Sequence, residues 1–171
     1  MSFNLVLGGV EIPETASFDL SQTYFDIGPQ AIIRFMDGSS EMQSTYSKLG
    51  TRISGVGWLA SGLDGLDYTA PMMLGCIAAR SISDAGLVID LPSARRSEPE
   101  FVPRGYATVN GGLIETDLAI VSDEATLTAV TGATGYRVDY YPYIQVRVLR
   151  PEMDMDARTP RYRWALTAEE V

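Results

Sequence analysis

Short stretches of apolar residues, many of them alternating with polar ones, run along the whole chain and are separated by turn residues. Alternation with a period of two, in segments rich in β-branched and aromatic residues, is typical of β-strands. Three of the separating turns, Gly8-Gly9, Asp37-Gly38 and Asn110-Gly111, are dipeptides that favour tight hairpins. The pattern therefore predicts hairpins over residues 5–12, 31–45 and 106–121.

Further strands are predicted outside these hairpins. Residues 125–130 fit a short helix capped by Ser122-Asp123-Glu124 and a strand equally well, because Thr126, Thr128 and Val130 are β-branched. With roughly nine or ten strands, we expect a mainly β protein, an antiparallel β-sandwich or barrel with long loops and at most one or two short helices. The additional predicted strands are 51–54, 72–82, 86–91, 136–141, 143–149 and 162–167.

One segment, residues 92–104, breaks this pattern. It holds three prolines, the pair Arg95-Arg96 and two glutamates, with Phe101 and Val102 as its only large apolar residues. Proline cannot donate to a strand ladder, and loops of this length within a domain are often functional. We expect a single domain spanning residues 1–171, with an extended loop or arm at about 92–104.

Composition sets the class of protein. With 46% hydrophobic residues, the chain can bury a core, and its longest apolar stretches are far below the roughly 20 residues that span a bilayer. The net charge of −9 opposes binding to a phosphate backbone. Twelve of the thirteen basic residues are arginines, which favour protein interfaces, and the lone Cys76 is expected to be buried. We expect an intracellular site of synthesis, no membrane insertion and no specific binding of nucleic acid.

The sequence offers little for catalysis. It contains no histidine, which excludes Ser-His-Asp and Cys-His catalysis and the common zinc sites. Its glycines follow neither the phosphate-loop nor the dinucleotide spacing. Glu152, Asp154 and Asp156 would share one face if the chain is extended there, and they form either an oxygen-rich cation spot or a solvated acidic turn. We predict no catalytic, cofactor-binding or metal-binding residues and no cofactor.

Four tyrosines gather near the C-terminus, at positions 136, 140, 141 and 143. Clustered tyrosines can pack one face of a sheet, stack against sugars or fill a pocket of a partner protein. Because neighbouring residues in a strand point to opposite faces, Tyr141 or Tyr143 is the member expected to be exposed.

Four segments spread along the chain have a recognisable sequence: Leu-Gly-Gly-Val-Glu-Ile-Pro at 7–13, Arg-Phe-Met-Asp-Gly-Ser-Ser at 34–40, Gly57-Trp58-Leu59 to Leu66-Asp67-Tyr68, and Tyr-Arg-Trp-Ala-Leu-Thr-Ala-Glu-Glu at 162–170. These segments resemble small tail structural proteins of long-tailed bacteriophages and related prophages. The resemblance spans most of the chain and covers tail tube, tail-tip or baseplate, and head-to-tail connector proteins alike.

The resemblance implies a non-enzymatic component of the virion tail, made in the bacterial cytoplasm. Such a chain would form rings of three or six subunits with other tail proteins, around an acidic lumen through which DNA passes. The loop at 92–104 and the terminal strand would then contact neighbouring subunits. The interface residues expected on this basis, together with the exposed tyrosines, are Arg95, Arg96, Phe101, Tyr141, Tyr143 and Trp164.

Two other functions remain open from the sequence. A carbohydrate- or ligand-binding β module would use the tyrosine cluster as an exposed aromatic groove. A carboxylate-dependent hydrolase would need a cleft with two close acids, one of which has a raised pKa.

Overall fold

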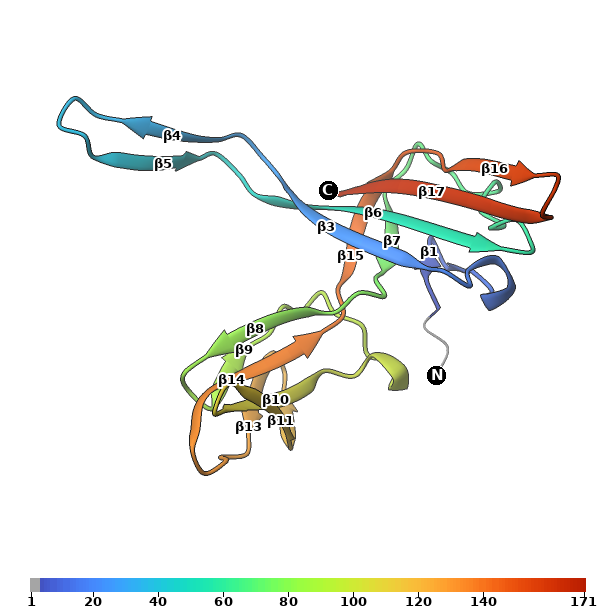
Figure 1. The fold of residues 1–171 in the computed structure, drawn as a ribbon. Helices are drawn as coiled ribbons and strands as arrows, with labels where there is room; N and C mark the ends of the chain where they lie inside the picture. Colours follow the sequence, from blue (N-terminus) through green and yellow to red (C-terminus); the bar gives the residue numbers. More distant parts are fainter. Residues whose placement is uncertain (1–3) are drawn as a thin grey trace. The chain divides into compact units, whose positions relative to one another are not determined.

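The computed structural model describes residues 4–171, and it confirms the mainly β fold (Figure 1). The contacts divide the chain into two compact units, where the sequence predicted a single domain. The host unit contains residues 7–73 and 145–171, and the inserted unit contains residues 4–6 and 74–144. The boundary falls inside three strands, β1 (Val6–Leu7), β7 (Met72–Gly75) and β15 (Tyr143–Val148). Because apolar runs continue through these strands, no change in composition marks the boundary.

The host unit contains an eight-stranded sheet and a separate two-stranded hairpin. The order in the large sheet is β2-β1-β7-β15-β17-β6-β3, and β16 also pairs with β17. The elements not yet defined are β2 (Val10–Glu11), the 3₁₀ helix η1 (Glu14–Ala16), β3 (Ser21–Ile27), β4 (Gln30–Arg34), β5 (Ser40–Ser44), β6 (Lys48–Gly57), β16 (Glu152–Asp156) and β17 (Arg161–Glu170).

The antiparallel ladder of β3, β6 and β17 is the framework of the host unit. Leu166 lies opposite Ile53, and both are buried on the core face of the sheet. Trp164 is also buried on this face, and its indole nitrogen donates a 2.8 Å hydrogen bond to the carbonyl oxygen of Ala16. Gly55 makes room for this ring, because a Cβ atom there would lie 2.5 Å from it. The pairing of Trp164 with glycine therefore fixes η1 to the sheet.

The inserted unit is a small sandwich of two open sheets. One sheet has the order β11-β10-β14-β8 and the other β12-β13-β9. Side chains from both sheets, including Ile89, Leu127 and Val138, share one hydrophobic core. The elements are β8 (Arg80–Asp84), β9 (Val88–Asp90), the 3₁₀ helix η2 (Pro99–Phe101), β10 (Arg104–Val109), β11 (Gly112–Thr116), β12 (Leu118–Val121), β13 (Glu124–Leu127) and β14 (Ala133–Tyr140).

Most of the predicted elements are confirmed, with finer divisions. The three hairpin turns form, and both residues of the Asn110-Gly111 turn have positive φ. Residues 124–127 are a strand, which resolves the ambiguity there. The single strand predicted over 72–82 is wrong: the chain leaves the ladder after Gly75 and pairs again from Arg80. Divisions of this kind raise the number of strands within the described residues to seventeen.

Candidate assembly interface

A two-stranded hairpin extends beyond the ends of β3 and β6, and we call residues 28–47 the arm (Figure 1). The β3–β6 ladder ends at the pair Ile27–Lys48, and the β4–β5 ladder begins at the pair Gln30–Ser44. Gly28 lies at this junction with φ +151°, and a Cβ atom there would lie only 2.0 Å from the carbonyl oxygen of Tyr46. The root of the arm is therefore a close backbone crossing that requires glycine.

The arm is closed by a tight turn at its tip. The backbone N–H of Phe35 donates to the carbonyl of Ser39, and the N–H of Gly38 donates to the carbonyl of Phe35. One carboxylate oxygen of Asp37 accepts hydrogen bonds from the hydroxyl of Ser39, at 2.6 Å, and from its backbone N–H, at 2.9 Å. These two bonds lower the pKa of Asp37 below its ordinary value. The turn chemistry thus fixes the register of the hairpin that the sequence predicted over residues 31–45.

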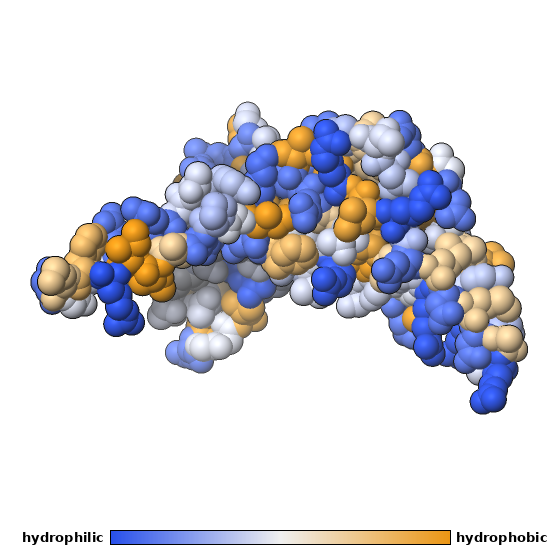
Figure 2. Space-filling model, turned by 90° about the horizontal axis from the view of Figure 1, so that it is seen from above, coloured by the Kyte–Doolittle hydropathy of each residue, from blue (hydrophilic) through white to orange (hydrophobic). Residues whose placement is uncertain are grey.

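Large apolar side chains of the arm are exposed in the part of the chain that the structure describes. All ten residues of β4 and β5 are exposed, and Met36 in the turn is fully exposed. Figure 2 shows hydrophobic surface along this projection, at the left of the view. Isolated two-stranded hairpins are marginally stable in water, and clustered exposed apolar residues mark interaction sites. The large apolar side chains exposed on the arm are Ile32, Ile33, Phe35, Met36, Met42 and Tyr46.

The two faces of the arm differ in chemistry. Ile32 lies directly opposite Met42, and Arg34 lies opposite Ser40 on the same face. On the other face Ile33 lies opposite Glu41, and Ala31 opposite Gln43. One face is therefore apolar with a positive charge, and the other is apolar with a negative charge.

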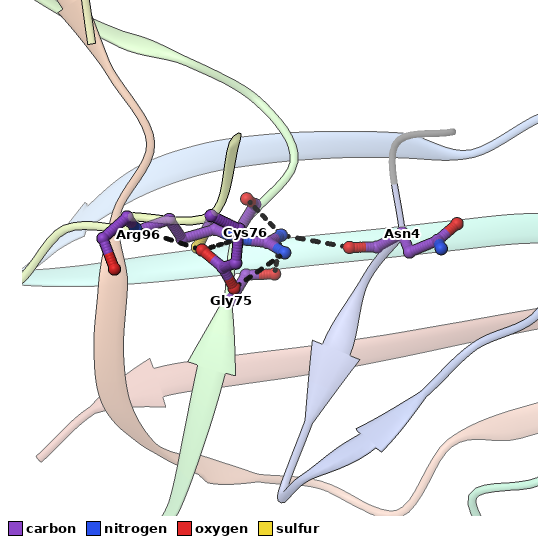
Figure 3. Close-up of polar contacts among 6 residues, drawn as sticks. Asn4, Gly75, Cys76 and Arg96 are labelled. Carbon is purple, nitrogen blue, oxygen red and sulfur yellow. Dashed lines mark hydrogen bonds and ion pairs between the residues drawn. The ribbon is translucent and has the colours of Figure 1, made fainter. Parts of the chain in front are cut away.

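The loop at 92–104, by contrast, is anchored to the inserted unit by Arg96, whose side chain is only 3% exposed (Figure 3). Its Nη1 donates to three backbone carbonyls, those of Asn4 at 3.0 Å, Gly75 at 3.3 Å and Cys76 at 3.1 Å. Its Nε and Nη2 donate to the two carboxylate oxygens of Glu98, at 3.3 and 3.2 Å. The planar fork of arginine thus satisfies five acceptors from three separate segments.

Aromatic packing and backbone pairing add to this anchor. The guanidinium of Arg96 lies 3.3 Å from the ring centroid of Phe101, which is itself buried and packs edge-on against Tyr141. The backbone N–H of Arg96 donates to the carbonyl of Tyr141, and that of Tyr143 donates to the carbonyl of Ala94. The loop is therefore exposed on its outer side, while these buried side-chain and backbone contacts fix it to the inserted unit.

These contacts correct the predicted interface. Arg96, Phe101 and Trp164 are buried, so their side chains are not available to a neighbouring subunit. Arg95 is half-buried and forms a 2.7 Å ion pair with Asp123, while its other nitrogen donates to the carbonyl of Ser122. Proline and charge content predicted an exposed loop, but they carry no signal for partners such as Asn4 and Asp123, which lie far away in the sequence.

The remaining two predicted interface residues, Tyr141 and Tyr143, belong to the tyrosine cluster. Tyr136 and Tyr140 are buried in the core of the inserted unit. Tyr141 is half-buried and packs against Phe101. Tyr143 is exposed. The cluster is mainly a packed sheet face, as one of the sequence interpretations held, and Tyr143 is its exposed member.

Two carboxylates, those of Glu98 and Asp156, have lowered pKa values because of hydrogen bonds that they accept within the fold. Burial raises the pKa of Glu98, but hydrogen bonds from its own backbone N–H and from Arg96 outweigh this, so the pKa lies below its ordinary value. Asp156 has a lowered pKa because it accepts hydrogen bonds from the backbone N–H of Arg158 and from Thr159.

Glu152, Asp154 and Asp156 lie on the strand β16, where Asp154 faces Arg163 and Asp156 faces Arg161. Among the described residues, no group of three or more Cys, Asp or Glu side chains is placed to hold a metal ion.

Comparison with known proteins adds no identification, since no protein-family model and no curated protein matches the chain. Within residues 4–171, no helix has the length and apolar character needed to cross a membrane.

Proposed function

We propose that this chain is a structural component of a bacteriophage tail, in the tail-tip, baseplate or tail-tube region, and that it assembles into an oligomeric ring through protein contacts of the arm. Two lines of support combine here. The sequence resembles small tail structural proteins, and the arm offers an apolar surface that residues 4–171 leave exposed.

The observation that carries the proposal is the exposure of the arm. A hairpin that projects from its sheet with Ile32, Phe35 and Met36 exposed gains little from its own unit. A partner that covers these side chains would bury apolar surface at about 25 cal/mol per Å² and would order the hairpin. The arm replaces the 92–104 loop as the proposed contact with neighbouring subunits.

Solution mass tests this proposal most simply. Light scattering over a range of concentrations, followed by electron microscopy, should show rings of three or six subunits for the unmodified chain. A variant with Ile32→Ser, Phe35→Ser and Met36→Ser should remain monomeric while keeping its fold, because these residues are exposed. Val121→Ser, at an exposed apolar residue of the inserted unit, is the matched control and should assemble normally.

A monomeric mass for the unmodified chain at every concentration would contradict self-assembly through the arm. So would rings that form equally well from the triple variant. The tail assignment has a separate test: mass spectrometry of purified virions from cells that carry this coding sequence should detect the chain in tails. Its absence from the particles would contradict a virion role.

A further inference from the structure

A second exposed apolar site lies on the host unit, at the end of the β3–β6 pair opposite the arm (Figure 1). Phe18 precedes β3 and Trp58 follows β6, and their rings pack edge-on with centroids 4.5 Å apart. Phe18 is 49% exposed, Trp58 61% and the adjacent Leu59 55%. We call these three residues the aromatic patch.

The backbone holds the aromatic patch in place before any partner arrives. The N–H of Phe18 donates to the carbonyl of Val56 at 2.8 Å, and the N–H of Trp58 donates to the carbonyl of Thr15 at 2.7 Å. Gly57 allows η1 to lie directly against β6, because a Cβ atom there would lie 2.4 Å from Ala16. An exposed aromatic pair that is already ordered loses little entropy on binding, which is a feature of interaction hot spots.

We infer that the aromatic patch receives the arm of a second copy of this chain, so that copies associate head to tail. The inference deepens the proposed function and rests on its claim that the arm mediates assembly. The arm and the patch are at opposite ends of β6, whose ten residues span about 30 Å, so an arm that points away from its own patch is available to another copy. Head-to-tail contacts of two different surfaces close into rings when the rotation between copies permits.

Charge favours a second copy as the occupant and selects one face of the arm. The side of the aromatic patch formed by η1 and the segment leading into β3 carries the exposed carboxylates of Glu14 and Asp19, and residues 11–20 contain no basic residue, whereas on the other side β17 brings the exposed Arg163 beside Val56. The Ile32–Met42 face of the arm carries Arg34 and no carboxylate, whereas the opposite face carries Glu41. The chain as a whole has a net charge of −9. The Ile32–Met42 face is not acidic, so the carboxylates beside the aromatic patch of another copy do not repel it. The Ile32–Met42 face should therefore contact the patch.

Cysteine cross-linking between two differently labelled chains tests the contact. Met42→Cys places a thiol on the proposed face, and Leu59→Cys places one in the aromatic patch, while the native Cys76 is buried in both chains. A disulfide requires the two Cβ atoms to approach within about 4.5 Å. On mild oxidation, we expect the mixed pair to form a linked dimer in several times the yield of two control mixtures. The controls are Gln43→Cys with Leu59→Cys, on the opposite face of the arm, and Met42→Cys with Leu113→Cys, an exposed residue of the inserted unit.

Charge reversal gives a second readout. Arg34→Glu alone should weaken assembly roughly two- to fivefold, as should Glu14→Arg with Asp19→Arg, because exposed ion pairs contribute up to about 1 kcal/mol. Combining all three substitutions should restore assembly, because each contact then pairs opposite charges again. Failure of this restoration would count against the chosen face.

Cross-linking decides between the inference and the proposed function. If the unmodified chain assembles and the arm variant does not, but Met42→Cys with Leu59→Cys links no better than the controls, the arm docks elsewhere: the inference is overturned and the proposed function stands. If the chain neither assembles nor cross-links above the controls, both are overturned. Preferential linking of Met42→Cys with Leu59→Cys supports both.

Discussion

Two segments of this chain leave the sheets for a long excursion, and they are held in opposite ways. The loop at 92–104 is rich in proline and charge, yet Arg96 and Phe101 fasten it to the inserted unit through buried hydrogen bonds and ring contacts. The arm is a regular hairpin with a well-formed turn, yet its ladder is isolated and its apolar side chains are exposed. A segment is therefore available to a partner when no buried contacts anchor it to its own unit. Its proline and charge content does not predict whether such contacts exist.

The largest expected difference between the two segments lies at Arg96. Arg96→Ala would leave three backbone carbonyls without their donor and remove the partner of Glu98, so it should lower the free energy of unfolding of the inserted unit by about 4 kcal/mol. Urea denaturation followed by circular dichroism measures this loss. Arg104→Ala, at an exposed arginine on β10, is the control and should cost under about 1 kcal/mol. A comparable loss in both variants would refute the anchoring role.

A matched pair of phenylalanines compares the two segments directly. Phe101→Ala should destabilise the chain by about 3 kcal/mol, because the ring is buried against Arg96 and Tyr141. Phe35→Ala removes the same atoms from an exposed turn and should change stability by less than about 0.5 kcal/mol. The same denaturation experiment measures both, and equal losses would mean that the arm is also packed in solution.

The root of the arm should be the next most sensitive point. Gly28→Ala would force a Cβ atom against the carbonyl of Tyr46 at a φ of +151°, at an expected cost of about 2 kcal/mol. The cost should appear as faster hydrogen exchange in β4 and β5 of the assembled protein, with the large sheet unaffected. Gly65→Ala is a suitable control, because an added Cβ there meets no atom within 4 Å. Unchanged exchange in the arm would show that the root tolerates a side chain.

The smallest effect concerns pH and the turn of the arm. Because hydrogen bonds from Ser39 lower the pKa of Asp37, the ionised carboxylate stabilises the turn at pH values above its unfolded-state pKa. That stabilisation is lost as the pH falls through the lower, folded-state pKa. The amide resonance of Ser39 should therefore titrate with a midpoint below 3.8, the ordinary value of the carboxyl group. Asp37→Asn should abolish the titration, and a midpoint above 3.8 would contradict the turn geometry.

Much of the fold could be predicted from the sequence because strands and tight turns are local. Asp37-Gly38 and Asn110-Gly111 identify their hairpins through the backbone conformations that these residues accept. The division into two units could not be predicted, because it depends on which distant strands pair. The apolar stretch from Met72 illustrates this, since it reads as one strand but serves both units.

The candidate site was harder to predict than the fold. The arm was correctly predicted as a hairpin. Residues 31–45 give little indication, however, of whether another strand or loop packs against it. The one available signal is that Ile32 and Ile33 are adjacent, so both faces of the hairpin are apolar. The anchor at Arg96 had no local signal, because its acceptors include the carbonyls of Asn4 and Gly75, and carbonyl groups are present at every residue.

Hydrogen exchange of the arm, compared between dilute monomer and assembled protein, tests the central claim most directly. If a partner covers the arm, the amides of β4 and β5 should exchange rapidly in the monomer and become protected on assembly, whereas the amides of the 92–104 loop should exchange alike in both states. Arm amides that exchange at the same rate in monomer and assembly would contradict the account, because the arm would then remain uncovered in the assembled particle.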